Sequence, residues 1–67
     1  MEDAKVTARE TIERLYEGYR EQKEYGDVVM RDMFANRMLG AIEVYQAVFH
    51  EIVKVGGKTV VYEEKGV

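Results

Sequence analysis

Residues 28–55 read VVMRDMFANRMLGAIEVYQAVFHEIVKV, and this stretch decides the fold. Placed at steps of about 100° around a helix axis, its apolar side chains fill an arc of roughly 200°. A surface helix in a monomer needs about half of that arc. We therefore predict a helix over about 28–55 that is too apolar for one chain to cover. The arc consists of Phe34, Met38, Ala41, Ile42, Tyr45, Val48, Phe49, Ile52 and Val53.

A shorter helix is predicted upstream, over about residues 3–25. Its apolar stripe is narrow and consists of Ala8, Ile12, Leu15 and Tyr19. Thr7 and Glu10 have the spacing of a capping box, which would start the helix near Ala8. Acidic residues before that point suit the positive end of a helix dipole, so we favour a start near Asp3.

The segment between the helices predicts a tight turn. Gly26 can take the left-handed conformation that ends a helix, and Asp27 can cap the next one. So short a connection implies an antiparallel helical hairpin. The sequence thus predicts an all-α fold in one domain, residues 1–67, with the chain after Gly56 and Gly57 outside the helices.

Residues 58–67 are predicted to form a short strand or an extended tail. Lys58 to Tyr62 is rich in β-branched and aromatic residues, which favour a strand. A lone strand is not stable, so three arrangements stay open. It can pair with its symmetry mate, add to a partner's sheet, or lie across the helices.

The chain is too short to be comfortably stable alone. It has no cysteine and one histidine, which argues against a disulfide, a structural zinc site or any other metal or cofactor site. We therefore predict a homo-oligomer, most simply a two-fold dimer that forms a four-helix bundle. Rings of hairpins remain the alternative. The predicted interface consists of Ala35, Met38, Ile42, Tyr45, Phe49 and Val53.

This predicted architecture resembles that of the plasmid regulator Rop, another short helical hairpin that dimerises into a four-helix bundle. The resemblance concerns architecture alone.

Two glycines lie inside the helical patterns, where each costs about 1 kcal/mol relative to alanine. We predict close approach of another helix at Gly40, which is next to Ala41, whereas Gly18 flanks the stripe of the first helix.

Composition and charge restrict the function. The net charge of −3 argues against nucleic acid as the partner. The longest apolar runs are three residues, so we expect no membrane span. Met1 to Asp3 is acidic, unlike a secretory signal, and we expect a cytoplasmic location.

No catalytic motif is present, and we predict a non-enzymatic adaptor, regulator or inhibitor that binds an unidentified protein. An origin in a phage or mobile element fits so small and acidic a chain. The predicted partner surface consists of Glu10, Glu13, Glu17, Glu21, Val60 and Tyr62. The acidic row among these also fits an ordinary solvated helix face.

Two alternatives remain. The first is a nucleic-acid or nucleotide binder that gathers basic residues across subunit boundaries. Those residues are Arg31, Arg37, Lys54 and Lys58. The second is an enzyme with a shared site around Glu43 and His50, which two exposed ligands on one helix support poorly.

Overall fold

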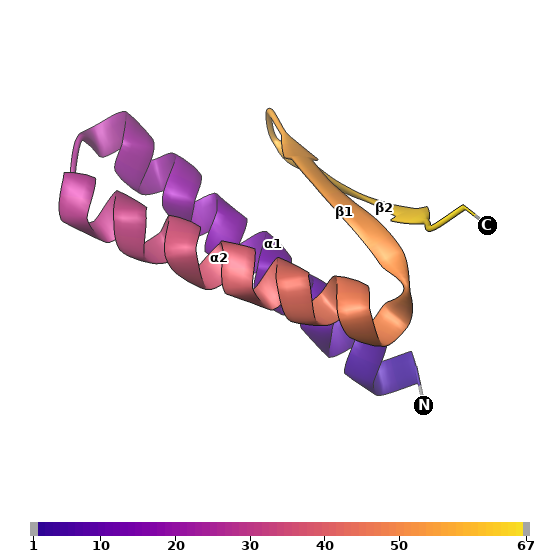
Figure 1. Ribbon diagram of the computed structural model, residues 1–67. Helices are drawn as coiled ribbons and strands as arrows, with labels where there is room; N and C mark the ends of the chain where they lie inside the picture. Colours follow the sequence, from indigo (N-terminus) through magenta and orange to yellow (C-terminus); the bar gives the residue numbers. More distant parts are fainter. Residues whose placement is uncertain (1, 67) are drawn as a thin grey trace.

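The computed structural model describes residues 2–66 and contains two helices followed by two strands (Figure 1). Helix α1 spans Glu2–Tyr25, helix α2 spans Val28–Phe49, strand β1 spans Glu51–Gly56 and strand β2 spans Thr59–Glu64. The helices lie side by side, and the strands turn back over them from the end of α2. The predicted helical hairpin is confirmed, while the β-hairpin makes the fold mostly rather than entirely helical.

The turn between the helices is built as the sequence predicts. Gly26 has a φ of 83°, in the left-handed region where glycine carries no steric penalty. The Asp27 side chain accepts a hydrogen bond from the Met30 backbone N–H at 3.0 Å, and so caps α2. Helix α1 begins well before Ala8. The Thr7 capping box is therefore not used, and the Thr11 hydroxyl donates to the Thr7 carbonyl at 2.9 Å.

The second helix ends at Phe49, and the prediction that it continues to about residue 55 is wrong. His50 has a φ of 56° and ψ of 38°, and its N–H donates to the Gln46 carbonyl at 3.1 Å, which closes the helix. Ile52, Val53 and Val55 then form a strand. Their β-branched side chains suit extended backbone, and β2 supplies the backbone partners that a strand needs.

The C-terminal segment is neither a lone strand nor a tail, because β2 pairs antiparallel with β1. Val53 lies opposite Tyr62, and Val55 lies opposite Val60. Gly57 and Lys58 form a two-residue turn, in which Gly57 has a φ of 55°. Glycine at the first position is characteristic of one of the two preferred turns of this length. Val67, the last residue of the predicted tail, lies outside the described residues.

The core lies between the two helices and under the β-hairpin. Among residues 2–66, the buried hydrophobic side chains are Ile12, Tyr16, Met38 and Tyr45. The Tyr45 ring contacts Phe49 and Tyr62, with ring centroids 4.9 and 5.3 Å apart. The β-hairpin thus covers part of the apolar arc that the sequence assigns to a second subunit.

This packing buries two of the predicted interface residues within a single chain. Met38 is 5% exposed and Tyr45 is 2% exposed in one chain, so neither has much surface for a second chain to cover. Val53 is half-buried on β1 and not on a helix. The remaining predicted residues, Ala35, Ile42 and Phe49, are half-buried on α2.

Gly18 is the glycine that allows close approach between the two helices. A Cβ placed there would lie 2.5 Å from Cε1 of Phe34. At Gly40, where the sequence predicts close approach, a Cβ would meet no atom of this chain within 4 Å. The contact predicted for Gly40 is therefore absent from the described part of the single chain.

The two glycines predict opposite results for the same substitution. Gly18→Ala displaces the Phe34 ring, and we expect overpacking of about 1–3 kcal/mol to exceed the gain of about 1 kcal/mol in helix propensity. Gly40→Ala should stabilise the isolated chain by up to about 1 kcal/mol, because its methyl group enters open space. Urea unfolding of both variants at low protein concentration measures this difference. Stabilisation by Gly18→Ala would contradict the packing described.

Candidate functional site

The most organised polar group of the chain is a cluster of Lys5, Arg9, Tyr45 and Glu51, here called the charged cluster. Lys5 and Arg9 are one turn apart on α1, so both point to the same side of that helix. Tyr45 lies near the end of α2. The left-handed turn at His50 places Glu51, the first residue of β1, beside it.

Glu51 is the centre of the charged cluster and is 8% exposed. Its Oε2 lies 2.6 Å from Lys5 Nζ, and its Oε1 accepts from Arg9 Nη2 at 2.8 Å. The Tyr45 hydroxyl donates to the same Oε1 at 2.5 Å and accepts from Arg9 Nε at 2.7 Å. Within residues 3–66 every buried side-chain nitrogen and oxygen has a partner. The carboxylate is therefore fully engaged by its own chain.

Tyr62 connects the charged cluster to β2. The Arg9 guanidinium lies 4.3 Å from the centroid of the Tyr62 ring, which is a cation–π contact. The Tyr62 hydroxyl donates to Glu13 Oε2 at 2.8 Å and also lies 3.2 Å from the Arg9 carbonyl oxygen. One arginine thus contacts α2, β1 and β2 at once.

Three groups of the charged cluster have pKa values shifted away from neutral pH: Glu51, Tyr45 and Arg9. Hydrogen bonds from Lys5, Tyr45 and Arg9 lower the pKa of Glu51 to about 2. Burial raises the pKa of Tyr45, and its hydrogen bond to Glu51 adds to the rise. Hydrogen bonds to Tyr45 and Glu51 raise the pKa of Arg9. An acid–base catalyst needs a pKa near the working pH, and none of these three groups has such a pKa.

The shifted pKa of Glu51 predicts a loss of stability in acid. Its pKa is about 2 when folded and 4.5 at the ordinary value, so the folded chain favours the charged form. This contribution is complete above about pH 4.5 and is lost as the pH falls from 4.5 towards 2. We expect the Tm of the unmodified chain to fall more steeply over that range than the Tm of Glu51→Gln. Parallel curves would show that the charged cluster does not stabilise the fold.

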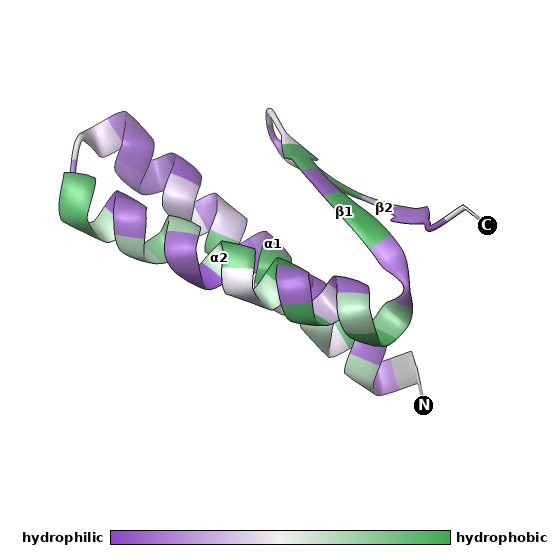
Figure 2. Cartoon of the chain, in the orientation of Figure 1, coloured by the Kyte–Doolittle hydropathy of each residue, from purple (hydrophilic) through white to green (hydrophobic). Residues whose placement is uncertain are grey.

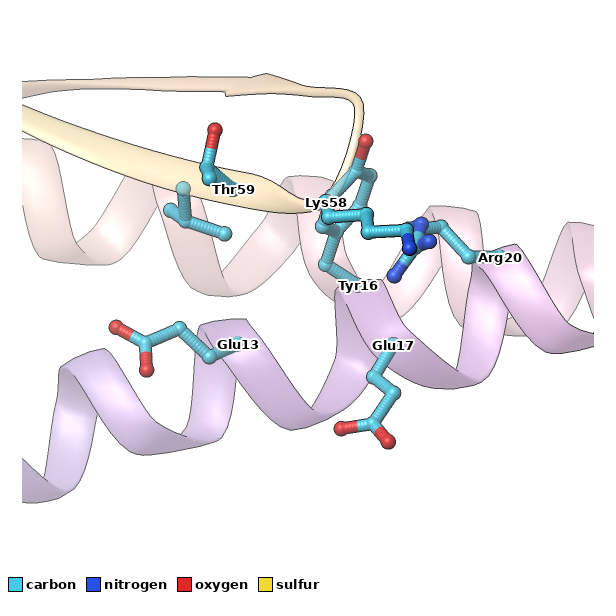
Figure 3. A pocket seen from close by; sticks show the side chains of 7 residues that line it. Glu13, Tyr16, Glu17, Arg20, Lys58 and Thr59 are labelled. Atoms are coloured by element: carbon cyan, nitrogen blue, oxygen red, sulfur yellow. The ribbon is translucent and has the colours of Figure 1, made fainter.

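A second polar feature is a pocket between α1 and the turn of the β-hairpin (Figure 3). Two acidic residues, Glu13 and Glu17, and two basic residues, Arg20 and Lys58, line it. At its base the Tyr16 hydroxyl donates to the Gly57 carbonyl at 2.8 Å, which ties the turn to α1. This mixture of charges fits neither an anion nor a cation well.

The predicted partner surface is divided by the fold. Glu10, Glu17 and Glu21 are exposed on α1, as is Glu13, which also bonds Tyr62. Val60 and Tyr62 are half-buried because they lie on the side of the β-hairpin that faces the helices. Tyr62 therefore belongs to the core contacts of its own chain and does not extend the acidic surface.

The residues of the two alternative functions are scattered. Arg31 pairs with Asp32 at 3.2 Å and Lys54 pairs with Glu63 at 3.0 Å. Glu43 is exposed on α2, and His50 is exposed at its end. Among the side chains of residues 3–66, no group of three His, Cys, Asp or Glu is arranged to hold a metal ion. None of the described helices is long and apolar enough to cross a membrane.

The pairing of Lys5 with Glu51 in the charged cluster was not predicted from the sequence. The available signal was Glu51 itself, a lone acid between Phe49 and the apolar pair Ile52 and Val53. A carboxylate inside an apolar run is expected to have a buried cationic partner.

Comparisons of the chain with protein-family models, curated proteins and solved structures give no significant match.

Proposed function

We propose that this chain is a non-enzymatic protein that forms a homo-oligomer, most simply a dimeric four-helix bundle, and acts by binding another macromolecule. The observation that carries the proposal is the size of its surface. A folded monomer of 7.8 kDa exposes about 4,400 Å². This chain exposes 5089 Å². The excess, roughly 700 Å², is close to the ~800 Å² that each partner of a standard interface covers.

Apolar side chains on α2 account for part of that surface. Each of these residues is more than half exposed: Val28, Val29, Leu39, Val44 and Val48. Figure 2 shows strongly apolar residues at the start of α2 and again along its middle turns. Such exposure on so small a protein is typical of a surface that another chain covers.

The charged cluster supports a binding function rather than catalysis. Its carboxylate is satisfied by three groups of the same chain, and the lowered pKa of Glu51 keeps that carboxylate charged at neutral pH. The hydrogen bonds and ion pairs of the charged cluster join α1, α2 and β1. The exposed acidic side chains Glu10, Glu17 and Glu21 on α1 suit a partner with a basic surface, which would make the chain an adaptor, regulator or inhibitor.

Sedimentation or light scattering at micromolar concentration tests the oligomer. We expect a mass of twice 7.8 kDa or a higher multiple. A mass of 7.8 kDa across that range would overturn the proposal, because the exposed surface would then be that of a stable monomer.

We expect no salt-dependent binding of labelled oligonucleotides or nucleotides. The chain has a net charge of −3, and two of the four candidate basic residues already pair with acids of their own chain. Fluorescence anisotropy at low and moderate salt measures this. Binding that weakens steeply as salt rises would favour the nucleic-acid alternative instead.

A further inference from the structure

The two helices leave an apolar groove uncovered, here called the helical groove. It is lined by Ala8 and Thr11 of α1 and by Gly40, Ala41, Val44 and Val48 of α2. Ala8 and Thr11 lie on a different side of α1 from Arg9 and Tyr16, which contact the β-hairpin. The β-hairpin therefore does not cover this groove. Val44 and Val48 are 63% and 59% exposed.

Gly40 is the feature that the single chain does not explain. Glycine inside a helix is less favourable than alanine. At Gly18 this disadvantage is balanced by the contact with Phe34, whereas at Gly40 a Cβ would meet nothing within 4 Å. Gly40 leaves a small depression in the helical groove, one helical turn from Val44 and two from Val48.

We propose that a second copy of this chain docks on the helical groove, with its α2 antiparallel to the first and a two-fold axis near Val44. Gly40 and Val48 are each four residues from Val44. The axis therefore places Gly40 of each copy opposite Val48 of the other, and the valine fills the depression. One patch is then complementary to itself, as a two-fold interface requires. This inference rests on the homo-oligomer proposed above and identifies its interface.

The position of the axis sets the extent of this contact. Helix α2 ends at Phe49, so an axis near Val44 lets residues 39–49 of the two α2 helices overlap over about 16 Å. Two neighbouring helices, each about 10 Å wide, offer a face of roughly 330 Å² over that length. That area is about half of the excess surface of the single chain. Over this length the dimer is a four-helix bundle with α2 of both copies at its centre and the β-hairpins on its outer sides.

Two charge substitutions on α2 distinguish this interface from other faces. Val44→Glu places a carboxylate at the axis, where it meets its own symmetry mate in an apolar contact. We expect it to weaken association on the order of 100-fold, as measured by sedimentation over a concentration series. Leu39→Glu is the matched control, because Leu39 is 60% exposed on the other side of the same helix. The control should keep the dimer, and circular dichroism should show equal helix content in both variants.

A third variant, at Gly40, should change the stability of the monomer and the strength of the dimer in opposite directions. Gly40→Leu should raise the Tm of the dilute, monomeric chain, because leucine favours a helix and the site is open. The same substitution should weaken the dimer, because leucine fills the depression that Val48 enters.

The outcomes separate this inference from the proposed function. A dimer that survives both Val44→Glu and Gly40→Leu, or one that only Leu39→Glu disrupts, overturns the interface and leaves the homo-oligomer intact. An unmodified chain that stays monomeric overturns the homo-oligomer itself. Loss of the dimer in Val44→Glu and Gly40→Leu alone supports the helical groove.

Discussion

Tyr45→Ala is expected to unfold the greater part of the chain at room temperature. The Tyr45 ring is 2% exposed and contacts both Phe49 and Tyr62. Removing a buried aromatic ring costs about 3–5 kcal/mol. A chain of 67 residues has a total stability of roughly 3–10 kcal/mol, so this loss is comparable to the whole. Urea unfolding followed by circular dichroism measures it.

Tyr45→Phe separates ring burial from the hydrogen bonds of the charged cluster. The variant keeps the ring contacts and loses only the hydroxyl that bonds Glu51 and Arg9. Arg9 and Glu51 remain paired with each other, so we expect a cost of about 1–2 kcal/mol. If Tyr45→Phe cost as much as Tyr45→Ala, the hydroxyl rather than the ring would hold the three elements together.

Tyr62→Ala is expected to detach the β-hairpin while leaving the helices formed. Tyr62 packs on Tyr45, lies under the Arg9 guanidinium and bonds Glu13. Because the ring is half-buried, we expect a loss of about 2–4 kcal/mol, mostly confined to the β-hairpin. Amide hydrogen exchange should show β1 and β2 losing protection before α1 and α2.

Ile52→Ala is the matched control on the same β-hairpin. Ile52 is 39% exposed and alternates with Val53, so it lies on the side of the sheet away from the helices. We expect a loss of no more than about 1 kcal/mol and an unchanged order of exchange. Equal effects of Tyr62→Ala and Ile52→Ala would show that the β-hairpin is not docked through Tyr62.

The local signals of the helical hairpin were sufficient to predict it. Gly26 and Asp27 act through nearby backbone groups alone, so their roles follow from residue type. The extent of the second helix did not follow in the same way. Between Phe49 and Val55 the apolar residues continue the helical arc, yet they also suit a strand, and only pairing with residues 59–64 decides between the two. Such a distant partner is invisible to a periodicity argument.

The charged cluster was harder to predict for the same reason. Lys5 and Glu51 are 46 positions apart, and they meet only because the chain turns at His50. With α2 ending early, Glu51 becomes a buried carboxylate at the start of a strand rather than an exposed residue on a helix. The error in the helix boundary and the missed cluster therefore have one cause.

The β-hairpin covers the part of the wide apolar arc of residues 28–55 that lies around Tyr45. The proposed contact with a second copy lies on the side of α2 that carries Gly40 and Val44. Phe49 also lines that side, whereas Ile42 lies outside it.

The central claim is that the chain leaves the helix at His50 and folds back over α1 and α2 as a β-hairpin. NMR Cα and Cβ chemical shifts of residues 50–56 test it most directly, because these shifts deviate in opposite directions in helices and strands. We predict strand values from Glu51 to Gly56, the bounds of β1. Helical values continuing to Val55 would contradict the account and restore the single long helix.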